Sequence, residues 1–257
     1  MLITPVRMVA LGRGATDYVA VALAAMLKCP VRFRKGSGKI SAIDPEIFSD
    51  ARKIDHMTIG QAKNFVEYSN PERQFLMLNS LELAAFYHVP LYFLPGPEHN
   101  FQGTGTAIGV AHEVSENDQF NVESFKALVV QDVYVFELTI PHAERHSLYE
   151  QLRNAGVEFG DFYGSGSQVV ITVNEKNLGS AIGVCQSCAP HNVYQRSSLT
   201  YLDSSIVPES EAISGAENAL RGIDTHLELS FGSALRFIVD LKDQHKAVCA
   251  LAIAFDL

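Results

Sequence analysis

The sequence predicts an α/β layer followed by two smaller α+β modules, on three observations. A glycine-containing turn between Leu11 and Asp17 opens directly into the apolar run Tyr18 to Leu27, which has helical spacing. Predicted strands and helices then follow one another up to about residue 108. From residue 127 a strand–helix–strand–strand–helix pattern appears, and helix, turn, strand and helix recur near the end of the chain. We therefore expect α/β and α+β architecture in one chain.

Length and charge exclude several classes of protein. At 257 residues the chain can bury a sizeable core and is long enough for two or three small domains. Its 20 lysines and arginines against 29 aspartates and glutamates give a net charge of −9, which argues against binding nucleic acid or anionic membranes. Apolar spans of about 18 residues do not occur, and Arg7 and Arg13 interrupt the N-terminus, so we expect neither a transmembrane helix nor a signal peptide. We expect a cytoplasmic protein.

Cysteines and histidines do not indicate a metal or redox site. The chain has four cysteines, which we expect to be free thiols: Cys29, Cys185, Cys188 and Cys249. The C-x-x-C spacing of Cys185 and Cys188 lacks a second pair, and both residues are expected on one helix. His142 and His146 are four positions apart but have no third ligand beside them. The sequence therefore predicts no metal and no cofactor.

The first part of the chain is predicted to begin with a strand from Ile3 to Leu11. Thr16 or Asp17 can then cap the helix that ends near Lys28. Alternation on both sides of Gly36-Ser37-Gly38 predicts a β-hairpin. The strands of the hairpin are expected at Val31 to Arg34 and Lys39 to Ile43. Helices are expected at Ile59 to Phe65 and Gln74 to Tyr87, and a strand at Val89 to Leu94. A linker is expected from His99 to Gln119.

The second part is predicted to hold the same pattern twice, once in full and once in part. Copy one has strands at Ala127 to Val130, Val133 to Ile140, Val157 to Tyr163 and Gln168 to Val173, and helices at His142 to Asn154 and Lys176 to Cys188. A strand from Val193 to Leu202 separates the copies. Copy two has a helix at Glu217 to Leu220, a turn at Gly222 to Asp224, a strand at Ala234 to Val239 and a helix at Lys242 to Phe255.

Four segments carry a resemblance to a known family: Leu11-Gly12-Arg13-Gly14-Ala15-Thr16-Asp17, Asp44 to Asp55, Leu81 to Leu91, and Gly105 to Ile108. In sequence and order they resemble the second half of the aspartokinase catalytic domain, which reads L-G-R-G-G-S-D, D-P-R-x-x-x-D-A-R-K-L-D, E-L-A-A-x-Y-x-V-P-L and G-T-L-I at these places. The later pattern resembles the two ACT domains, small ferredoxin-like modules, that follow that domain.

The resemblance implies a domain organisation. Residues 1–108 would form a truncated amino-acid-kinase-like αβα layer, 109–126 a linker, and 127–257 paired ACT domains. Copy one would take about 127–190 and copy two about 191–257. In the family, one ACT module is inserted into the other, and the modules share a sheet that binds lysine or threonine at an interface.

The chain departs from the family at residues that surround the nucleotide. Lined up on Asp44-Pro45, the family's Thr-Asp pair falls on Lys35 and Gly36. Its Arg falls on Glu46, whose carboxylate would repel a phosphate, and its Lys falls on Gln74. The family's K-x-G-G-[TS] turn, which holds the phosphates, is not in the sequence. Because phosphoryl transfer needs positioned cations around the γ-phosphate, we expect that this chain by itself does not phosphorylate aspartate.

The resemblance also implies two sets of ligand contacts. The first is a remnant of the substrate turn, formed by Arg13, Gly14, Thr16 and Asp17. Arg13 would bind a carboxylate and Thr16 would donate in place of Ser, although Asp17 has the alternative role of a helix cap. The second set lies in the ACT copies, at Glu158 and Asp161 in copy one and at Asp224 and Glu228 in copy two.

Three functions are compatible with these observations. The first is a catalytically inactive regulatory or structural subunit that senses an amino-acid-like ligand through its ACT domains. It would form a homodimer through ACT pairing, or a hetero-oligomer with a full-length kinase or another chain that covers an exposed parallel edge of the first layer. The alternative is a repurposed or split enzyme of amino-acid metabolism that uses the pocket from Arg13 to Asp17, with Lys35. The third is a structural oligomer without a ligand.

Overall fold

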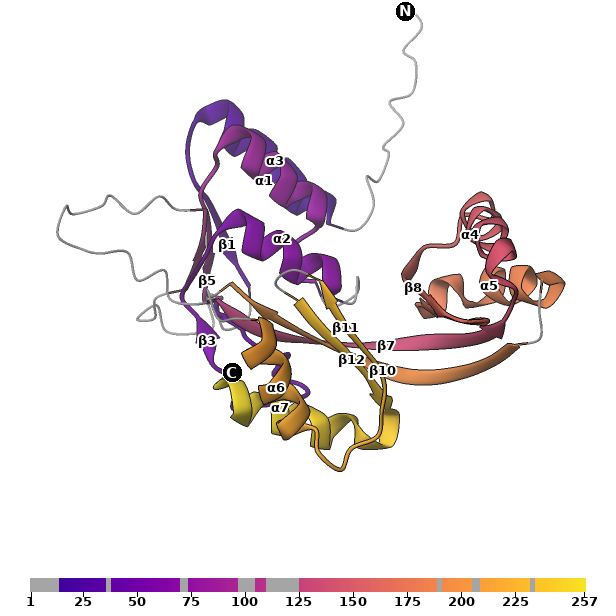
Figure 1. The fold of residues 1–257 in the computed structure, drawn as a ribbon. Helices are drawn as coiled ribbons and strands as arrows, with labels where there is room; N and C mark the ends of the chain where they lie inside the picture. Colours follow the sequence, from indigo (N-terminus) through magenta and orange to yellow (C-terminus); the bar gives the residue numbers. More distant parts are fainter. Residues whose placement is uncertain are drawn as a thin grey trace, which may run out of the picture. The chain divides into compact units, whose positions relative to one another are not determined.

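A computed structural model describes residues 14–35, 38–69, 74–96, 105–109, 125–188, 191–204, 209–231 and 234–257 (Figure 1). Within these ranges the side chains at positions 161, 209 and 226–231 are not described. The chain divides into two units. Unit 1 comprises Met1–Ala42 and Arg52–Phe125, and unit 2 comprises Ile43–Ala51 and Lys126–Leu257. A short segment of the N-terminal sequence therefore belongs to the C-terminal unit.

Unit 1 is built on a four-stranded mixed sheet with the order β1-β5-β6-β4. β1 (Val31–Arg34) runs parallel to β5 (Leu91–Leu94), β6 (Thr106–Ile108) runs antiparallel to β5, and β4 (His56–Met57) runs parallel to β6. Two further strands, β2 (Ile40–Ser41) and β3 (Lys53–Ile54), pair antiparallel with each other. The helices are α1 (Ala15–Leu27), α2 (Ile59–Tyr68) and α3 (Leu78–Tyr87), and α3 packs against both of the others.

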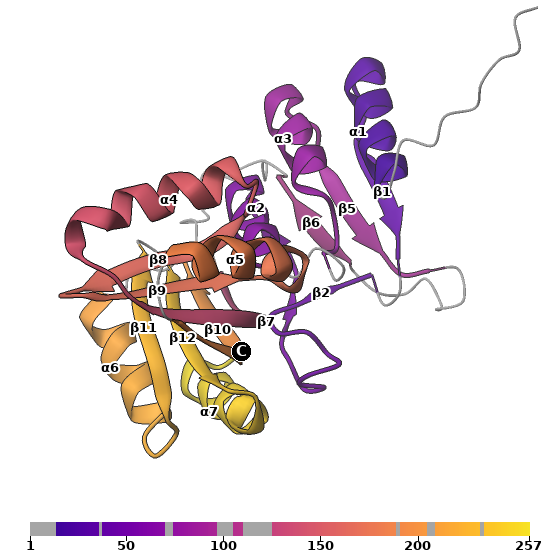
Figure 2. The ribbon, with the colours of Figure 1, turned by 90° about the vertical axis from the view of Figure 1, so that its right-hand side faces the viewer.

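Two helix–strand pairs of unit 1 have the same local design. α1 and α3 each end at a residue in the left-handed conformation, Lys28 at φ 52° and His88 at φ 53°, which closes the helix. A proline follows two positions later in both cases, and the next strand begins directly after it. Because β1 and β5 pair in parallel with Val31 opposite Leu91, the two helices lie side by side (Figure 2).

The hairpin predicted in unit 1 is wrong. Val31–Arg34 pairs with β5 and Ile40–Ser41 pairs with β3, so the two strands belong to different sheets. β1 buries Val31 and Phe33, and the Phe33 ring stacks on Phe93 of β5 with 5.1 Å between the ring centres. Alternation in a sequence indicates which face of a strand is buried, but it does not identify the neighbouring strand.

Three other elements expected in the first part, a strand, a helix and the linker, are compared with the structure next. The strand expected from Ile3 to Leu11 lies outside the described residues. The helix expected from Gln74 begins at Leu78, and the Gln74 side chain instead donates to the Val66 carbonyl. Within the expected linker from His99 to Gln119, the described residues 105–109 include β6, which is an internal strand of the sheet.

Unit 2 is built on a six-stranded antiparallel sheet with the order β11-β12-β10-β7-β9-β8. The strands are β7 (Lys126–Thr139), β8 (Phe159–Ser165), β9 (Gln168–Val173), β10 (His191–Asp203), β11 (Thr225–Phe231) and β12 (Ala234–Asp240). The helices are η1 (His142–Glu144), α4 (Arg145–Asn154), α5 (Glu175–Cys188), α6 (Glu209–Ala219), η2 (Leu241–Asp243) and α7 (Gln244–Phe255). Among the helices in the described part of the chain, none is long and apolar enough to cross a membrane.

Two long strands, β7 and β10, connect the two halves of unit 2. They pair from His191 opposite Leu138 to Asp203 opposite Lys126. β9 and β8 extend the sheet at one end of this pair of strands, and β12 and β11 extend it at the other. α4 and α5 lie at the first end, and α6 and α7 at the second (Figure 1). After the repeated pattern expected from the sequence, we call the end with β8 and β9 copy one and the end with β11 and β12 copy two. Both ends use the same two strands, β7 and β10.

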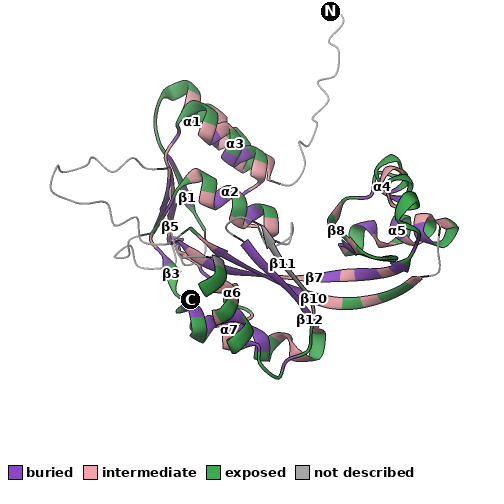
Figure 3. Cartoon of the chain, viewed as in Figure 1, coloured by how far each residue is buried: buried purple, intermediate pink, exposed green. Residues whose placement is uncertain are grey.

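Each copy has a core of its own. In copy one, Phe136 of β7 is buried in a cluster with Leu152 of α4 and Cys185 of α5. In copy two, the Tyr201 ring of β10 stacks on Phe255 of α7 with 4.0 Å between the ring centres. Buried positions follow β7 and β10 into both cores (Figure 3). The shared strands therefore contribute side chains to two separate cores.

The second part of the chain differs from the sequence prediction in three elements. The strands expected at Ala127 to Val130 and Val133 to Ile140 are one strand, β7. The two polar residues between them, Gln131 and Asp132, continue the pairing with β10. The sequence analysis did not predict β11, and α6 begins at Glu209 rather than at Glu217.

Replacing Phe136 by Ala should destabilise unit 2. The Phe136 side chain is fully buried, and shortening such a side chain costs about 3–5 kcal/mol. Urea unfolding followed by circular dichroism should show a lower midpoint for the transition of unit 2. The matched control is Tyr163→Ala on β8, where the side chain is 47% exposed and the expected change is below about 1 kcal/mol. Equal effects of the two substitutions would contradict the assigned core.

Candidate functional site

The predicted glycine turn ends at Gly14, the residue before α1, which has φ +76°. A Cβ atom at this position would lie 2.2 Å from Cγ of Met77, so glycine is needed both for the backbone angle and for space. The expectation that Thr16 or Asp17 caps α1 is wrong, because Gly14 is the cap residue and no side chain bonds there. Thr16 is exposed in the first turn, and Arg13 lies outside the described residues.

Asp17 is paired with Lys35. The Nζ atom of Lys35 lies 2.6 Å from Oδ2 of Asp17 and also donates to the Phe75 carbonyl at 3.2 Å. The same atom lies 5.3 Å from the centre of the Phe33 ring, which adds a cation–π contact. The Lys35 side chain is 41% exposed and the Asp17 side chain 18%. An ion pair this exposed contributes up to about 1 kcal/mol, so it orders both side chains but remains breakable.

Lys35 lies at the edge of the sheet where β1 and β5 end. Because β6 runs antiparallel to β5 and pairs Thr106 with Phe93, β6 begins at this same edge. β4 begins there too, directly after Asp55. Ligands of α/β folds bind at the carboxyl ends of parallel strands, so this edge is the candidate site of unit 1.

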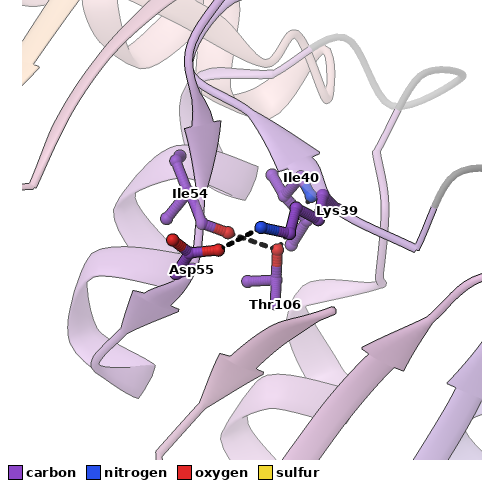
Figure 4. Close-up of polar contacts among 5 residues, drawn as sticks. All are labelled: Lys39, Ile40, Ile54, Asp55 and Thr106. Carbon is purple, nitrogen blue, oxygen red and sulfur yellow. Dashed lines mark hydrogen bonds and ion pairs between the residues drawn. The ribbon is translucent and has the colours of Figure 1, made fainter. Parts of the chain in front are cut away.

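Thr106 connects three strands at this edge (Figure 4). Its buried hydroxyl accepts a hydrogen bond from the Ile40 N–H at 2.9 Å and donates to the Ile54 carbonyl at 2.5 Å. Beside it, Nζ of Lys39 lies 2.5 Å from Oδ1 of Asp55. One hydroxyl therefore joins β2, β3 and β6, and a second lysine–aspartate pair lies next to it.

Glycines allow the backbones to approach closely at this edge. A Cβ atom on Gly105 would lie 1.6 Å from the Phe93 carbonyl oxygen. Gly38 has φ +78°, and a Cβ atom there would lie 2.1 Å from the Pro95 nitrogen. Its carbonyl also accepts the Thr106 N–H at 3.2 Å. Side chains are therefore excluded between the ends of β5 and β6.

The sequence analysis did not select Lys39, Asp55 or Thr106 as site residues. Asp55 and Thr106 do lie in two of the segments that carry the aspartokinase resemblance. Their partners are far away in the sequence, with 52 positions between Thr106 and Ile54, so the sequence held no local signal for the contacts.

The four ACT candidates lie at opposite edges of the sheet in unit 2. Glu158 and Asp161 are at the start of β8, and Asp224 and Glu228 are at the start of β11. In both strands the pairing register shifts at the second residue, and such a shift at a sheet edge redirects the neighbouring side chains. The two pairs therefore have the same local setting, on the two outer strands of the sheet.

The structure describes the side chains of two of these four candidates, Glu158 and Asp224. Glu158 is exposed, with Oε2 3.5 Å from Nζ of Lys176, and its carbonyl accepts from the side chain of the buried Asn177 at 3.0 Å. Asp224 is exposed directly before β11. The side chains of Asp161 and Glu228 are not among those that the structure describes.

Arg236 is a further candidate that the sequence analysis missed. It lies on β12 in copy two, is 8% exposed, and donates from Nε to Oγ1 of Thr200 at 3.2 Å. Its guanidinium also lies 3.3 Å from the place that a Cβ atom on Gly160 would occupy, at the register shift of β8. A residue of copy two therefore contacts the candidate site of copy one. An arginine inside the predicted apolar strand Ala234 to Val239 was the available signal.

The four cysteines are present as free thiols and form no disulfide. Cys29, Cys185, Cys188 and Cys249 are all free. Burial, together with Cys188 nearby, raises the pKa of Cys185 to about 11, so this thiol stays protonated near neutral pH and is a poor nucleophile. Among the described residues, no group of three or more histidine, cysteine or acidic side chains is arranged to hold a metal ion.

Comparison with known proteins gives a partial match. No family model matches the chain. The aspartokinase of Pseudomonas aeruginosa is 32% identical over 111 residues, which is 42% of this chain and 25% of that protein. The chain is related to the aspartokinases. Because the match spans a quarter of the curated aspartokinase, the similarity by itself does not carry over the activity of the whole enzyme.

Solved aspartokinase structures share the fold. Aspartokinase III of E. coli, in complex with aspartate and ADP, has a TM-score of 0.74 at 17% identity, over 96% of this chain and 57% of that one. The aspartate kinase of Clostridium acetobutylicum has a TM-score of 0.77 at 12% identity, over 93% and 57%. The common architecture is mixed α/β, with a small, partly parallel sheet and an antiparallel sheet.

Replacing Thr106 by Val should destabilise unit 1. The change keeps the shape but leaves the Ile40 N–H and the Ile54 carbonyl without the hydroxyl, at a cost of about 1–3 kcal/mol. Thr106→Ser keeps the hydroxyl and should cost less, so the two variants separate lost hydrogen bonds from lost packing. The free energy of unfolding from urea titration is the measurement. A Ser variant less stable than the Val variant would contradict the role of the hydroxyl.

Thiol labelling should separate Cys29 from Cys185. Cys29 is exposed, whereas Cys185 is buried with its pKa raised to about 11, so at pH 8 a maleimide should modify Cys185 at least about 100-fold more slowly. Peptide mass spectrometry of the native protein gives both rates, and labelling in denaturant is the control, in which both thiols should react. Rapid labelling of Cys185 in native protein would show that α5 opens readily.

Proposed function

We propose that the chain is an aspartokinase-like regulatory or structural subunit that does not by itself transfer a phosphoryl group. Residues 1–108 would be a remnant of the catalytic domain, and 127–257 a pair of ACT modules that sense an amino-acid-like ligand. Assembly would be a homodimer through the modules or a complex with a full-length kinase.

The ion pair between Lys35 and Asp17 is the observation that carries this proposal. By the aspartokinase resemblance, Asp17 belongs to the turn around the aspartate substrate, and Lys35 stands where the family has Thr of its Thr-Asp pair. The Lys35 ammonium lies 2.6 Å from the Asp17 carboxylate, so this carboxylate already has a cationic partner within the chain. A substrate cation that binds Asp17 would have to displace Lys35 from it.

Two other positions that the family uses around the nucleotide support the absence of kinase chemistry. Gln74, in the place of a lysine, donates its side-chain amide to the Val66 carbonyl at 2.9 Å and carries no charge. Glu46, in the place of an arginine, is an exposed residue with a negative side chain. Both changes remove cations that would neutralise the transferred phosphoryl group.

The edges of the unit 2 sheet support the sensing role. β8 and β11 are the outer strands, and outer strands with open N–H and C=O groups readily pair with another chain. Pairing of β8 with β11 of a second copy would bring Glu158 and Asp161 close to Asp224 and Glu228. Carboxylates at such a junction would bind a ligand ammonium, while backbone N–H groups at the register shifts would bind its carboxylate.

Regulation by such a subunit requires two assembly states with different affinities for the ligand. Arg236 offers a connection inside the chain, because it lies in copy two and contacts Gly160 in copy one. A change in the position of β8 on ligand binding would therefore change the surroundings of Arg236 on β12.

A thermal-shift panel of the twenty amino acids and of ATP with magnesium tests the proposal. An amino acid at about 100 times its Kd should stabilise the protein by about 2.7 kcal/mol, a rise of several degrees in Tm, and ATP with magnesium should produce no shift. The double variant Glu158→Gln/Asp224→Asn should lose the response to the amino acid.

The matched control is Glu211→Gln, an exposed position on α6, which should respond like the natural chain. Stabilisation by ATP with magnesium, together with formation of ADP when aspartate is added, would contradict the proposal and favour the repurposed or split enzyme. A panel without any response would contradict the sensing role and favour a structural oligomer.

A further inference from the structure

The outer face of α1 is apolar. Four large apolar side chains recur on it at helical spacing: Val19, Leu23, Met26 and Leu27. Their exposed fractions are 40%, 52%, 79% and 72%. The opposite side of α1 is also apolar and buries Val21 and Ala24. A helix that is apolar on all sides is normally covered on all sides, so the outer face needs a partner.

α3 continues this apolar surface. Phe86 and Tyr87 occupy the same positions in α3 that Met26 and Leu27 occupy in α1, two residues and one residue before the left-handed residue that ends each helix. Phe86 is 75% exposed and Tyr87 is 54% exposed. α1 and α3 pack side by side (Figure 2), so we treat these exposed side chains together as one surface. We call it the α1–α3 face, made of Val19, Leu23, Met26, Leu27, Phe86 and Tyr87.

The α1–α3 face is large and carries few charges. The charged residues within α1 and α3 are Asp17, in the first turn of α1, and Glu82, one turn before Phe86. The Glu82 side chain is 54% exposed and lies 3.9 Å from Nζ of Lys63, which offsets its charge. Large apolar side chains have on the order of 200 Å² of surface each, so these six present roughly 700 Å². Apolar patches above about 600 Å² are unusual on monomers, and a stable interface buries about 800 Å² on each partner.

We propose that the α1–α3 face binds a second copy of this chain, with the two helix pairs related by a two-fold axis. A two-fold contact requires a surface that is complementary to itself, and a face made of six apolar side chains meets this condition. The net charge of −9 opposes contact between copies through charged surfaces, which favours this apolar face. The face belongs to unit 1, so this proposal does not depend on ligand sensing in unit 2.

Sedimentation velocity of the full chain over a hundredfold range of concentration tests the proposal. The natural chain should associate, and Leu23→Glu/Met26→Glu should halve its limiting mass, because four like charges would meet at the two-fold contact. The matched control is Ile253→Glu on α7, an equally exposed apolar position in unit 2, which should keep the mass of the natural chain. The ratio of the masses is the readout, so additional pairing through β8 and β11 does not obscure the result.

Cys29 provides an independent measurement. It is exposed two residues beyond Leu27, so association through the α1–α3 face should slow its labelling by a bulky maleimide at high protein concentration. The double variant should be labelled at the same rate at all concentrations. Equal masses of the double variant and the natural chain would overturn the proposal. A lower Tm of the double variant at unchanged mass would also overturn it, because the face would then be covered by another part of the same chain.

Discussion

The antiparallel pairing of β7 with β10 is the constraint on which unit 2 depends. These strands are shared by both copies, so a slip of one residue would turn Phe136 out of the first core and Tyr201 out of the second together. Neither copy has a complete sheet without them, because β9 needs β7 and β12 needs β10. The two ends of the sheet are therefore coupled because the same two strands run through both, and the Arg236 guanidinium of copy two lies next to Gly160 of copy one.

In unit 1 two lysines near the strand ends are paired with carboxylates of the same unit. Lys35 binds Asp17 and Lys39 binds Asp55, each within hydrogen-bond distance. A phosphoryl-transfer site needs cations directed at the phosphates, and neutralised pairs would have to separate to supply them. At the same edge, Gly38 and Gly105 bring backbones so close that no side chain fits between them.

The surfaces that remain exposed differ in physical character between the two units. Unit 1 presents an apolar face on α1 and α3, where association would be driven by removal of apolar surface from water. Unit 2 presents strand edges, where association would be driven by backbone hydrogen bonds and would have specific register.

The sequence by itself determined the order and type of most elements, because helical spacing, alternation and glycine turns are local properties of the chain. It also indicated the relation to aspartokinases through ordered motifs such as Gly105 to Ile108, and it predicted a repeated module in the second part. Only the tertiary structure decided which strands pair with each other and which charged side chains form ion pairs. It separated β1 from β2, joined two predicted strands into β7, and replaced the expected helix cap by a bond from Lys35 to Asp17. These outcomes depend on residues that are distant in the sequence, since the pairing of strands and charges is set by burial and packing, for which a single sequence carries no local signal.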